Sequence, residues 1–154
     1  KLISAFKNKK NVKIENLALS SSSGTVELRV PIRDENADYN DEEKYELGIA
    51  TIHSENNLHN KNYETIKDIK KISLDEYNFL HEIGFIKIDV EGYEMEVLKG
   101  AEKTLQTNTY VMIELNSNTG KYGSSNQECM DLLHKNGYKL LLEHWPDKVY
   151  YRAD

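Results

Sequence analysis

The sequence contains a single cysteine, Cys129, among its 154 residues. One cysteine cannot form a disulfide within the chain, so no internal cross-link contributes to its stability. Cys129 falls in a predicted helix, where we expect it to act as a small packing residue. A chain of this length is one domain's worth of sequence and is large enough to bury a hydrophobic core.

The chain also lacks an excess of basic residues and any long apolar run. Its 26 acidic and 20 basic residues give a net charge of −6. This balance offers no electrostatic footprint for nucleic acid or for an anionic membrane, so we expect neither as a partner. No apolar run approaches the length of a transmembrane helix and no signal peptide is visible, so a cytoplasmic protein is the default expectation.

Residues 85–94 hold the most informative stretch of the sequence. They open with an apolar, β-branched run typical of a buried parallel strand, followed by Asp89 and Glu91 and then by Gly92 at the expected turn. Residues 94–105 then change to helical periodicity. Ligands of open α/β sheets bind outside the carboxyl ends of the strands, so the two acids are candidate functional residues. They would equally serve as caps of the following helix, where acids are common.

The rest of the chain alternates between short apolar runs and amphipathic segments, which predicts an α/β fold. We expect one sheet that contains residues 12–18, 85–90, 110–115 and 138–142. Helices 94–105 and 125–136 should pack on it, the second starting at a capping box. Further predicted elements are a strand over residues 25–32, a short strand over 66–74, a helix over 75–82, and a strand over 149–151 that is joined to 138–142 by a turn at 145–148.

The stretch Phe85–Glu94, followed by Val97–Ala101, resembles the signature of FkbM-type S-adenosylmethionine-dependent methyltransferases. Flanking segments support the resemblance in the right order along the chain. They are Asn11–Gly24, which resembles the third-strand segment of the family, Ser73–Asp75 before the signature, Ile113–Glu114 at the end of the next strand, and Gly137–Tyr138 at the start of a late strand.

The resemblance implies a Rossmann-like class I methyltransferase sheet, mostly parallel and ending in an antiparallel hairpin. The family's glycine-rich cofactor loop lies upstream of the segment that resembles residues 11–24. No G-x-G occurs between Lys1 and Val12. We therefore expect residues 1–154 to be a single partial methyltransferase domain, with the N-terminal strands and cofactor loop missing and a variable, substrate-side insertion at about residues 33–64. Alone it should be inactive and bind S-adenosylmethionine weakly.

The resemblance also implies S-adenosylmethionine as cofactor and O-methylation of a hydroxyl on a small metabolite or saccharide. By the same resemblance, Ala18 and Leu19 would border the adenine of the cofactor. We assign Asp89 first to positioning of cofactor or substrate, and Glu91 and Glu114 second, because a carboxylate can take the hydroxyl proton or hold the cofactor's positive end. We assign no metal ligands. Lys87, unusual in a buried strand, should pair with one of the acids.

Two other functions remain open from the residues alone. Three acids at strand ends could hold Mg²⁺ for phosphoryl transfer, although the sequence shows neither a glycine-rich phosphate loop nor a basic cluster. The chain could also keep the fold as a binding or structural module without catalysis.

Overall fold

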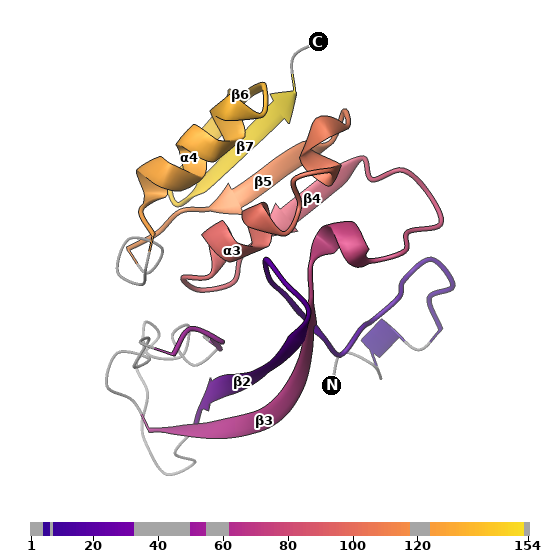
Figure 1. Ribbon diagram of the computed structural model, residues 1–154, viewed down its shortest axis with the longest axis vertical. Helices are drawn as coiled ribbons and strands as arrows, with labels where there is room; N and C mark the ends of the chain where they lie inside the picture. The colour runs from indigo at the N-terminus through magenta and orange to yellow at the C-terminus, as the bar shows by residue number, and fades with distance from the viewer. Residues whose placement is uncertain (1–4, 7, 33–49, 55–61, 118–123, 153–154) are drawn as a thin grey trace.

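The computed structural model describes residues 5–6, 8–32, 50–54, 62–117 and 124–152. These residues form a three-stranded sheet of order β1-β3-β2 and a four-stranded sheet of order β4-β5-β7-β6. Figure 1 shows the larger sheet with α3 and α4 on one face, and the β2–β3 ribbon extending away from it. The fold is therefore mixed α/β, but the described strands lie in two sheets and not in the single sheet that was predicted.

The elements follow one another in a simple order. The strands are β1 (Ala18–Leu19), β2 (Gly24–Pro31), β3 (Tyr63–Ile72), β4 (Phe85–Ile88), β5 (Tyr110–Glu114), β6 (Tyr138–His144) and β7 (Asp147–Arg152), and the helices are α3 (Glu94–Lys99), α4 (Asn126–Lys135) and the 3₁₀ turns η2 (Leu74–Glu76) and η3 (Thr104–Gln106).

The three-stranded sheet is built mainly from β2 and β3, which pair antiparallel from Gly24↔Lys71 to Pro31↔Tyr63. The predicted strand over 25–32 is confirmed, whereas the strand expected at 66–74 is longer at its start. Of the predicted strand at 12–18, only Ala18 lies in a strand, and β1 runs parallel to the end of β3. Placing 12–18 in the same sheet as 85–90 was wrong, because β1 pairs with the last two residues of β3 in the smaller sheet.

The four-stranded sheet places β4 parallel to β5, while β7 is antiparallel to both β5 and β6. The predicted C-terminal hairpin is confirmed. The mostly parallel sheet is not, since β4–β5 is the sheet's one parallel pair among the described residues. Nor is β4 buried as predicted: it lies at the sheet edge with one described neighbour, and Phe85 is 55% exposed.

Both predicted helices near the signature are shorter than expected. The run at 94–105 breaks into α3 and η3, because the backbone N–H of Asp75 donates to the Gly100 carbonyl and the Asp75 carboxylate accepts from the N–H groups of Lys103 and Thr104. These bonds replace the intrahelical ones. The predicted helix 75–82 is only η2, which ends at Tyr77 in an extended conformation.

The helix α4 agrees closely with the prediction of a helix over 125–136. Ser125 and Glu128 form the capping box, and Gly137 follows the helix with φ of 84°, a conformation in which glycine is favoured. Cys129 on this helix is fully buried, and burial raises the pKa of its thiol to about 12. Its predicted packing role is confirmed.

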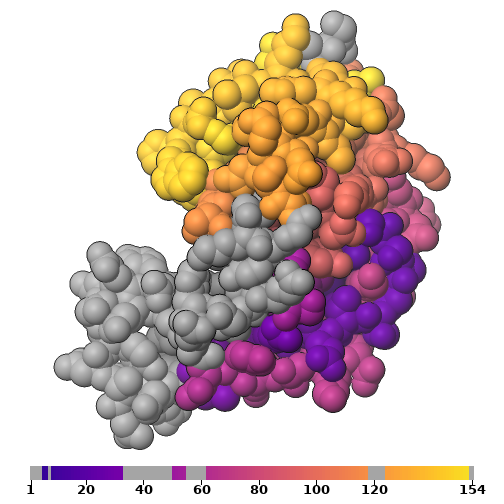
Figure 2. Space-filling view, turned by 60° about the vertical axis from the view of Figure 1, so that its left-hand side comes forward, coloured from indigo at the N-terminus to yellow at the C-terminus, as the bar shows by residue number. Residues whose placement is uncertain are grey.

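The core lies between the four-stranded sheet and the helices that cover it. Its buried members are Leu74, Ile88, Val97, Leu98, Ala101, Leu105, Val111, Ile113, Leu115, Cys129, Leu133, Tyr138 and Tyr150. The space-filling view shows the α4 region and the C-terminal strands as one continuous body above the segments of the smaller sheet (Figure 2). No helix in the described part of the chain is long and apolar enough to cross a membrane.

The two sheets meet where the end of β1 approaches the end of α3. A Cβ added at Gly100 would lie 2.0 Å from the Ser20 carbonyl oxygen, so only glycine lets the two backbones come this close. Ser20 is buried, and its N–H donates to the Ile72 carbonyl at 2.9 Å. This contact fixes the β1 end against the helix that follows the signature.

Candidate active site

Three acids gather at the carboxyl edge of the paired strands β4 and β5. Asp89 and Glu91 follow the end of β4, and Glu114 ends β5. Because the strands are parallel and adjacent, these ends share one edge of the sheet. One carboxylate oxygen from each acid lies within 4.8 Å of the others, with Asp89 exposed and the other two half-buried. The structure thus brings together all three predicted catalytic residues.

A fourth acid, Asp147, contributes to the charge at this edge. It begins β7 directly across from Glu114 in the antiparallel register. Partial burial, followed by the negative charges of Asp89, Glu91 and Asp147, raises the pKa of Glu114, although the Asn116 amide donates to its carboxylate at 3.0 Å. Sequence reasoning missed Asp147, because an acid beside a predicted turn carries no functional signal.

Lys87 supplies positive charge next to this cluster. Its Nζ lies 2.8 Å from Oδ2 of Asp89, and this hydrogen bond is the main reason that the pKa of Lys87 is raised. The predicted pairing with an acid is confirmed. The expected burial is wrong, because the side chain is 48% exposed on an edge strand.

The Glu94 side chain stabilises the turn that carries Glu91, because it accepts hydrogen bonds from the backbone of that turn. Glu91 has φ of 54° and Gly92 has φ of 98°, so two successive residues adopt left-handed conformations. The Glu94 side chain, only 2% exposed, accepts hydrogen bonds from the N–H groups of Val90 and Gly92 at 3.1–3.2 Å. Sequence reasoning treated Glu94 only as a first-turn acid, whereas the structure makes it the support of the turn.

The capping interpretation of Asp89 receives no support from the geometry. Tyr93 is the N-cap residue of α3, and no side chain caps the helix there. The hydrogen bond of Asp89 goes to Lys87 and not to a helix N–H group.

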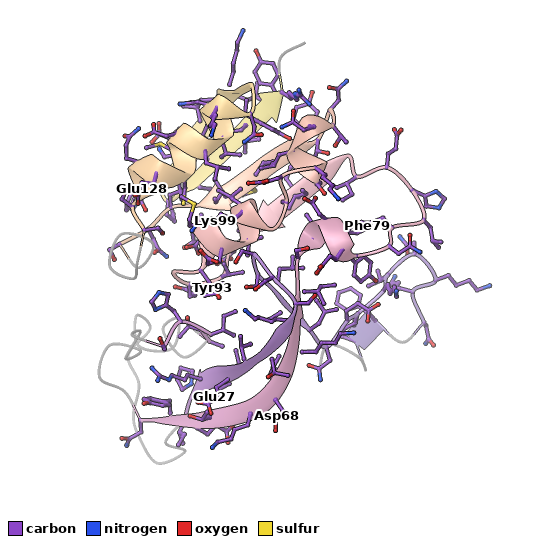
Figure 3. All side chains as sticks on the ribbon, viewed as in Figure 1. Glu27, Asp68, Phe79, Tyr93, Lys99 and Glu128 are labelled. Carbon is purple, nitrogen blue, oxygen red and sulfur yellow. The ribbon has the colours of Figure 1, made fainter. Side chains whose placement is uncertain are left out.

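One short segment of the variable insertion reaches the same turn. Thr51, which is 1% exposed, donates from Oγ1 to the Glu91 carbonyl at 3.1 Å. The ring of His53 packs edge-on against Tyr93 with centroids 6.1 Å apart. Figure 3 labels Tyr93 between α3 and the smaller sheet. Of the predicted insertion at about 33–64, the structure describes only residues 50–54 and 62–64.

The two predicted adenine neighbours lie apart from the acids. Ala18 and Leu19 are half-buried in β1, and Leu19 lines a cavity of about 470 Å³ to which none of the three acids contributes. The other lining residues are Lys13, Glu15, Leu17, Leu74, Tyr77, Asn78, Phe79 and Leu80. The serines that follow β1 turn toward α3, because Ser20 Oγ lies 3.4 Å from the Tyr93 hydroxyl and Ser21 donates to Glu96.

Comparison with known proteins places these features in context. A sequence profile described as "Methyltransferase FkbM domain" matches residues 2–140. A curated protein from Haloferax volcanii, named hexuronic acid methyltransferase AglP, is 38% identical over 65 residues, which is 40% of this chain and 27% of that protein.

A crystal structure of methyltransferase FkbM from Methylobacillus flagellatus KT is similar in fold. It superposes with a TM-score of 0.55 at 13% sequence identity, over 97% of this chain and 32% of that chain. The matched parts therefore amount to about a quarter and a third of the length of these two relatives.

Proposed function

Because this chain belongs to the FkbM methyltransferase family, we propose that it forms part of an S-adenosylmethionine-dependent O-methyltransferase. The acceptor would be a hydroxyl on a small metabolite or saccharide, and the reacting end of the site would be the edge formed by Asp89, Glu91 and Glu114. The observation that carries the proposal is the gathering of these three carboxylates within 4.8 Å at the ends of β4 and β5. Such an edge is where open α/β sheets bind their ligands.

The acids suit the charged end of the proposed cofactor. S-adenosylmethionine, when bound, supplies a methyl group activated by a sulfonium centre, and its methionine end also carries an ammonium group. A cluster of carboxylates complements both positive charges. Asp89 is our first candidate for this role, since it directly follows β4 and its carboxylate lies at this edge of the sheet.

Glu114 is the best placed of the three to accept the hydroxyl proton. Its pKa is raised by partial burial and by the neighbouring acids. A raised pKa brings a carboxyl closer to the working pH and makes it a stronger base than an ordinary carboxylate. Glu91 would orient the acceptor from the strained turn held by Glu94.

The adenine of the cofactor would lie near Ala18 and Leu19. The cavity beside Leu19 is lined mainly by leucines and by the rings of Tyr77 and Phe79. Apolar and aromatic walls of this kind suit a flat, uncharged ring.

The name of the Haloferax volcanii relative supports a saccharide as acceptor. A hexuronic acid offers both hydroxyls and a carboxylate as possible methyl acceptors. The carboxylate would be repelled by the acids at the β4–β5 edge, whereas a hydroxyl can donate a hydrogen bond to them. We therefore propose an ether and not an ester as the product.

The decisive experiment measures methyl transfer by the whole protein to a panel of neutral and uronic saccharides, with mass spectrometry of the products. Asp89→Asn keeps the size of the side chain and removes the charge that would complement the cofactor, so activity should fall about a hundredfold, in line with the roughly 1.5–3 kcal/mol that a contact with a charged group contributes. Glu102→Gln, an exposed site after α3, is the matched control and should leave the rate unchanged. Equal rates in the two variants would contradict the role of Asp89, and phosphoryl transfer in place of methylation would favour the Mg²⁺ alternative.

A further inference from the structure

The outer strand of the larger sheet presents an unusual apolar surface. β6 is the end strand in the order β4-β5-β7-β6, so among the described residues only β7 pairs with it. Leu140, Leu141 and Leu142 are 44%, 58% and 60% exposed, and Trp145 in the following turn is 67% exposed. A bulge against β7 falls between Leu140 and Leu142 and disturbs the alternation of faces. An exposed, apolar edge strand is a template for pairing with another chain.

The sequence of this strand is complementary to itself in the antiparallel direction. The order is Lys139, Leu140, Leu141, Leu142, Glu143. If two copies pair antiparallel about Leu141, each Lys139 lies opposite Glu143 of the other copy, and Leu140 lies opposite Leu142. Opposite charges and apolar pairs directly across two strands both stabilise the pairing.

We propose that this protein forms a homodimer through its β6 strands, paired antiparallel about a twofold axis at Leu141. The pairing would join two four-stranded sheets into one continuous sheet, with the same surface used by both copies, as twofold symmetry requires. Glu143 already contacts Lys148 of its own chain, but its side chain is 50% exposed. A carboxylate accepts several hydrogen bonds, so it can also receive the partner's Lys139.

The pairing residues 139–143 lie two strands away from β4, while the Trp145 turn that follows them adjoins Asp147 at the acidic edge. Two strands, β5 and β7, separate β4 from β6, so the pairing strand is remote from Asp89 in the sheet order. Figure 2 shows the yellow residues of the C-terminal hairpin at the outer end of the molecule. The proposal is therefore independent of the methyltransferase function, and each copy would keep its own site.

Sedimentation equilibrium on the wild-type protein and three variants tests this dimer. Lys139→Glu places two acids across each end of the paired strands, so the dimer should dissociate at least tenfold more readily, because like charges directly opposite are destabilising. The double variant Lys139→Glu with Glu143→Lys exchanges the charges and should restore much of the wild-type affinity.

Lys67→Glu is the matched control, because it changes the net charge equally on an exposed residue of β3 in the other sheet. It should leave the association unchanged, and circular dichroism confirms that each variant is folded. A monomeric wild-type protein would overturn the proposal. So would a dimer that responds to Lys139→Glu no more than to Lys67→Glu, or one that the double variant fails to restore.

Discussion

The two sheets of this protein differ in how they are stabilised. The hydrophobic core in the described part of the chain lies between Leu74 and Tyr150, around the four-stranded sheet, whereas Pro31 is the buried apolar residue of β2. In the three-stranded sheet, β3 is exposed along its first six residues and again at Lys70, and its remaining positions are only partly buried. The larger sheet is thus held by packing, whereas the smaller one depends on its backbone ladder and on a few specific contacts with its neighbour.

The candidate site therefore combines acids carried by the well-packed sheet with neighbours from the less buried part of the molecule. The acids stand on the packed sheet, where Ile88 and Ile113 just before Asp89 and Glu114 are almost fully buried. A segment bridged to the smaller sheet through Arg29 and Thr51 reaches the site by a single contact, that of Thr51 with the Glu91 carbonyl. Side chains carried by the well-packed sheet keep their geometry, while the less buried part can vary in sequence at small energetic cost.

The largest effect should come from removing the support of the acidic turn. Glu94→Ala leaves the N–H groups of Val90 and Gly92 without their acceptor in a buried place and also opens a void. We expect a loss of about 3 to 5 kcal/mol in the free energy of unfolding, measured by urea denaturation. Glu64→Ala on the exposed β3 is the control and should change stability by less than about 0.5 kcal/mol. Similar losses in both would refute the contrast between the sheets.

A smaller effect should follow from a substitution that forces the end of β1 away from the end of α3. In Gly100→Ala the new methyl group meets the Ser20 carbonyl at 2.0 Å, and a backbone atom cannot move aside cheaply. We expect a destabilisation of about 1 to 3 kcal/mol, as for other overpacked sites, visible as a lower melting temperature. Gly84→Ala is the control, since its added Cβ meets nothing within 4 Å. Equal melting temperatures for the two alanine variants would contradict the close packing of β1 against α3.

The smallest predicted effect is a change with pH in the stability of a Glu114 variant relative to wild type. The raised pKa of Glu114 means that the folded protein holds this proton more tightly than the unfolded chain does. The resulting stabilisation is complete below the ordinary glutamate value and is lost as pH rises through the raised folded pKa. Glu114→Gln should therefore become more stable relative to wild type as pH increases from about 4 to about 7. Urea unfolding across this range checks the sign, with Glu102→Gln as the reference for the loss of one carboxylate, and a difference that shrinks with pH would contradict it.

The sequence predicted most of the packed half of the fold, because its elements have strong local signals. The capping box at Ser125 and Glu128, the glycine after α4 and the C-terminal hairpin were all confirmed. The meeting of Asp89 with Glu114 followed from the rule that parallel neighbours end at the same edge. The incorrect predictions concerned features that depend on residues distant in the sequence. The helix after the signature, for example, is shortened by the Asp75 side chain, which accepts a hydrogen bond from Lys103, 28 residues away.

The smaller sheet was predicted less well for a related reason. The segment 12–18 alternates apolar and polar residues like a strand, yet only Ala18 and Leu19 pair with the end of β3, and residues 12–17 form no strand. Asp147 and Glu94 were missed as members of the site because each has an ordinary local role, one at a turn and one in a helical first turn. Their importance arises only from the residues that the fold brings beside them.

The contact of Thr51 with the Glu91 carbonyl has a consequence for protein engineering. If residues 33–64 form the predicted substrate-side insertion, grafting the corresponding segment of another family member would be a route to a new acceptor specificity. In this chain the graft would replace a hydroxyl, 1% exposed, that satisfies the carbonyl of a residue held at φ of 54°. A chimera that brings an aliphatic side chain to this position would leave that carbonyl without its side-chain donor, and would change the turn that presents Glu91 along with the pocket it was meant to redesign. The boundaries of such grafts should therefore be drawn outside residues 50–54, so that the incoming loop inherits the original hydroxyl.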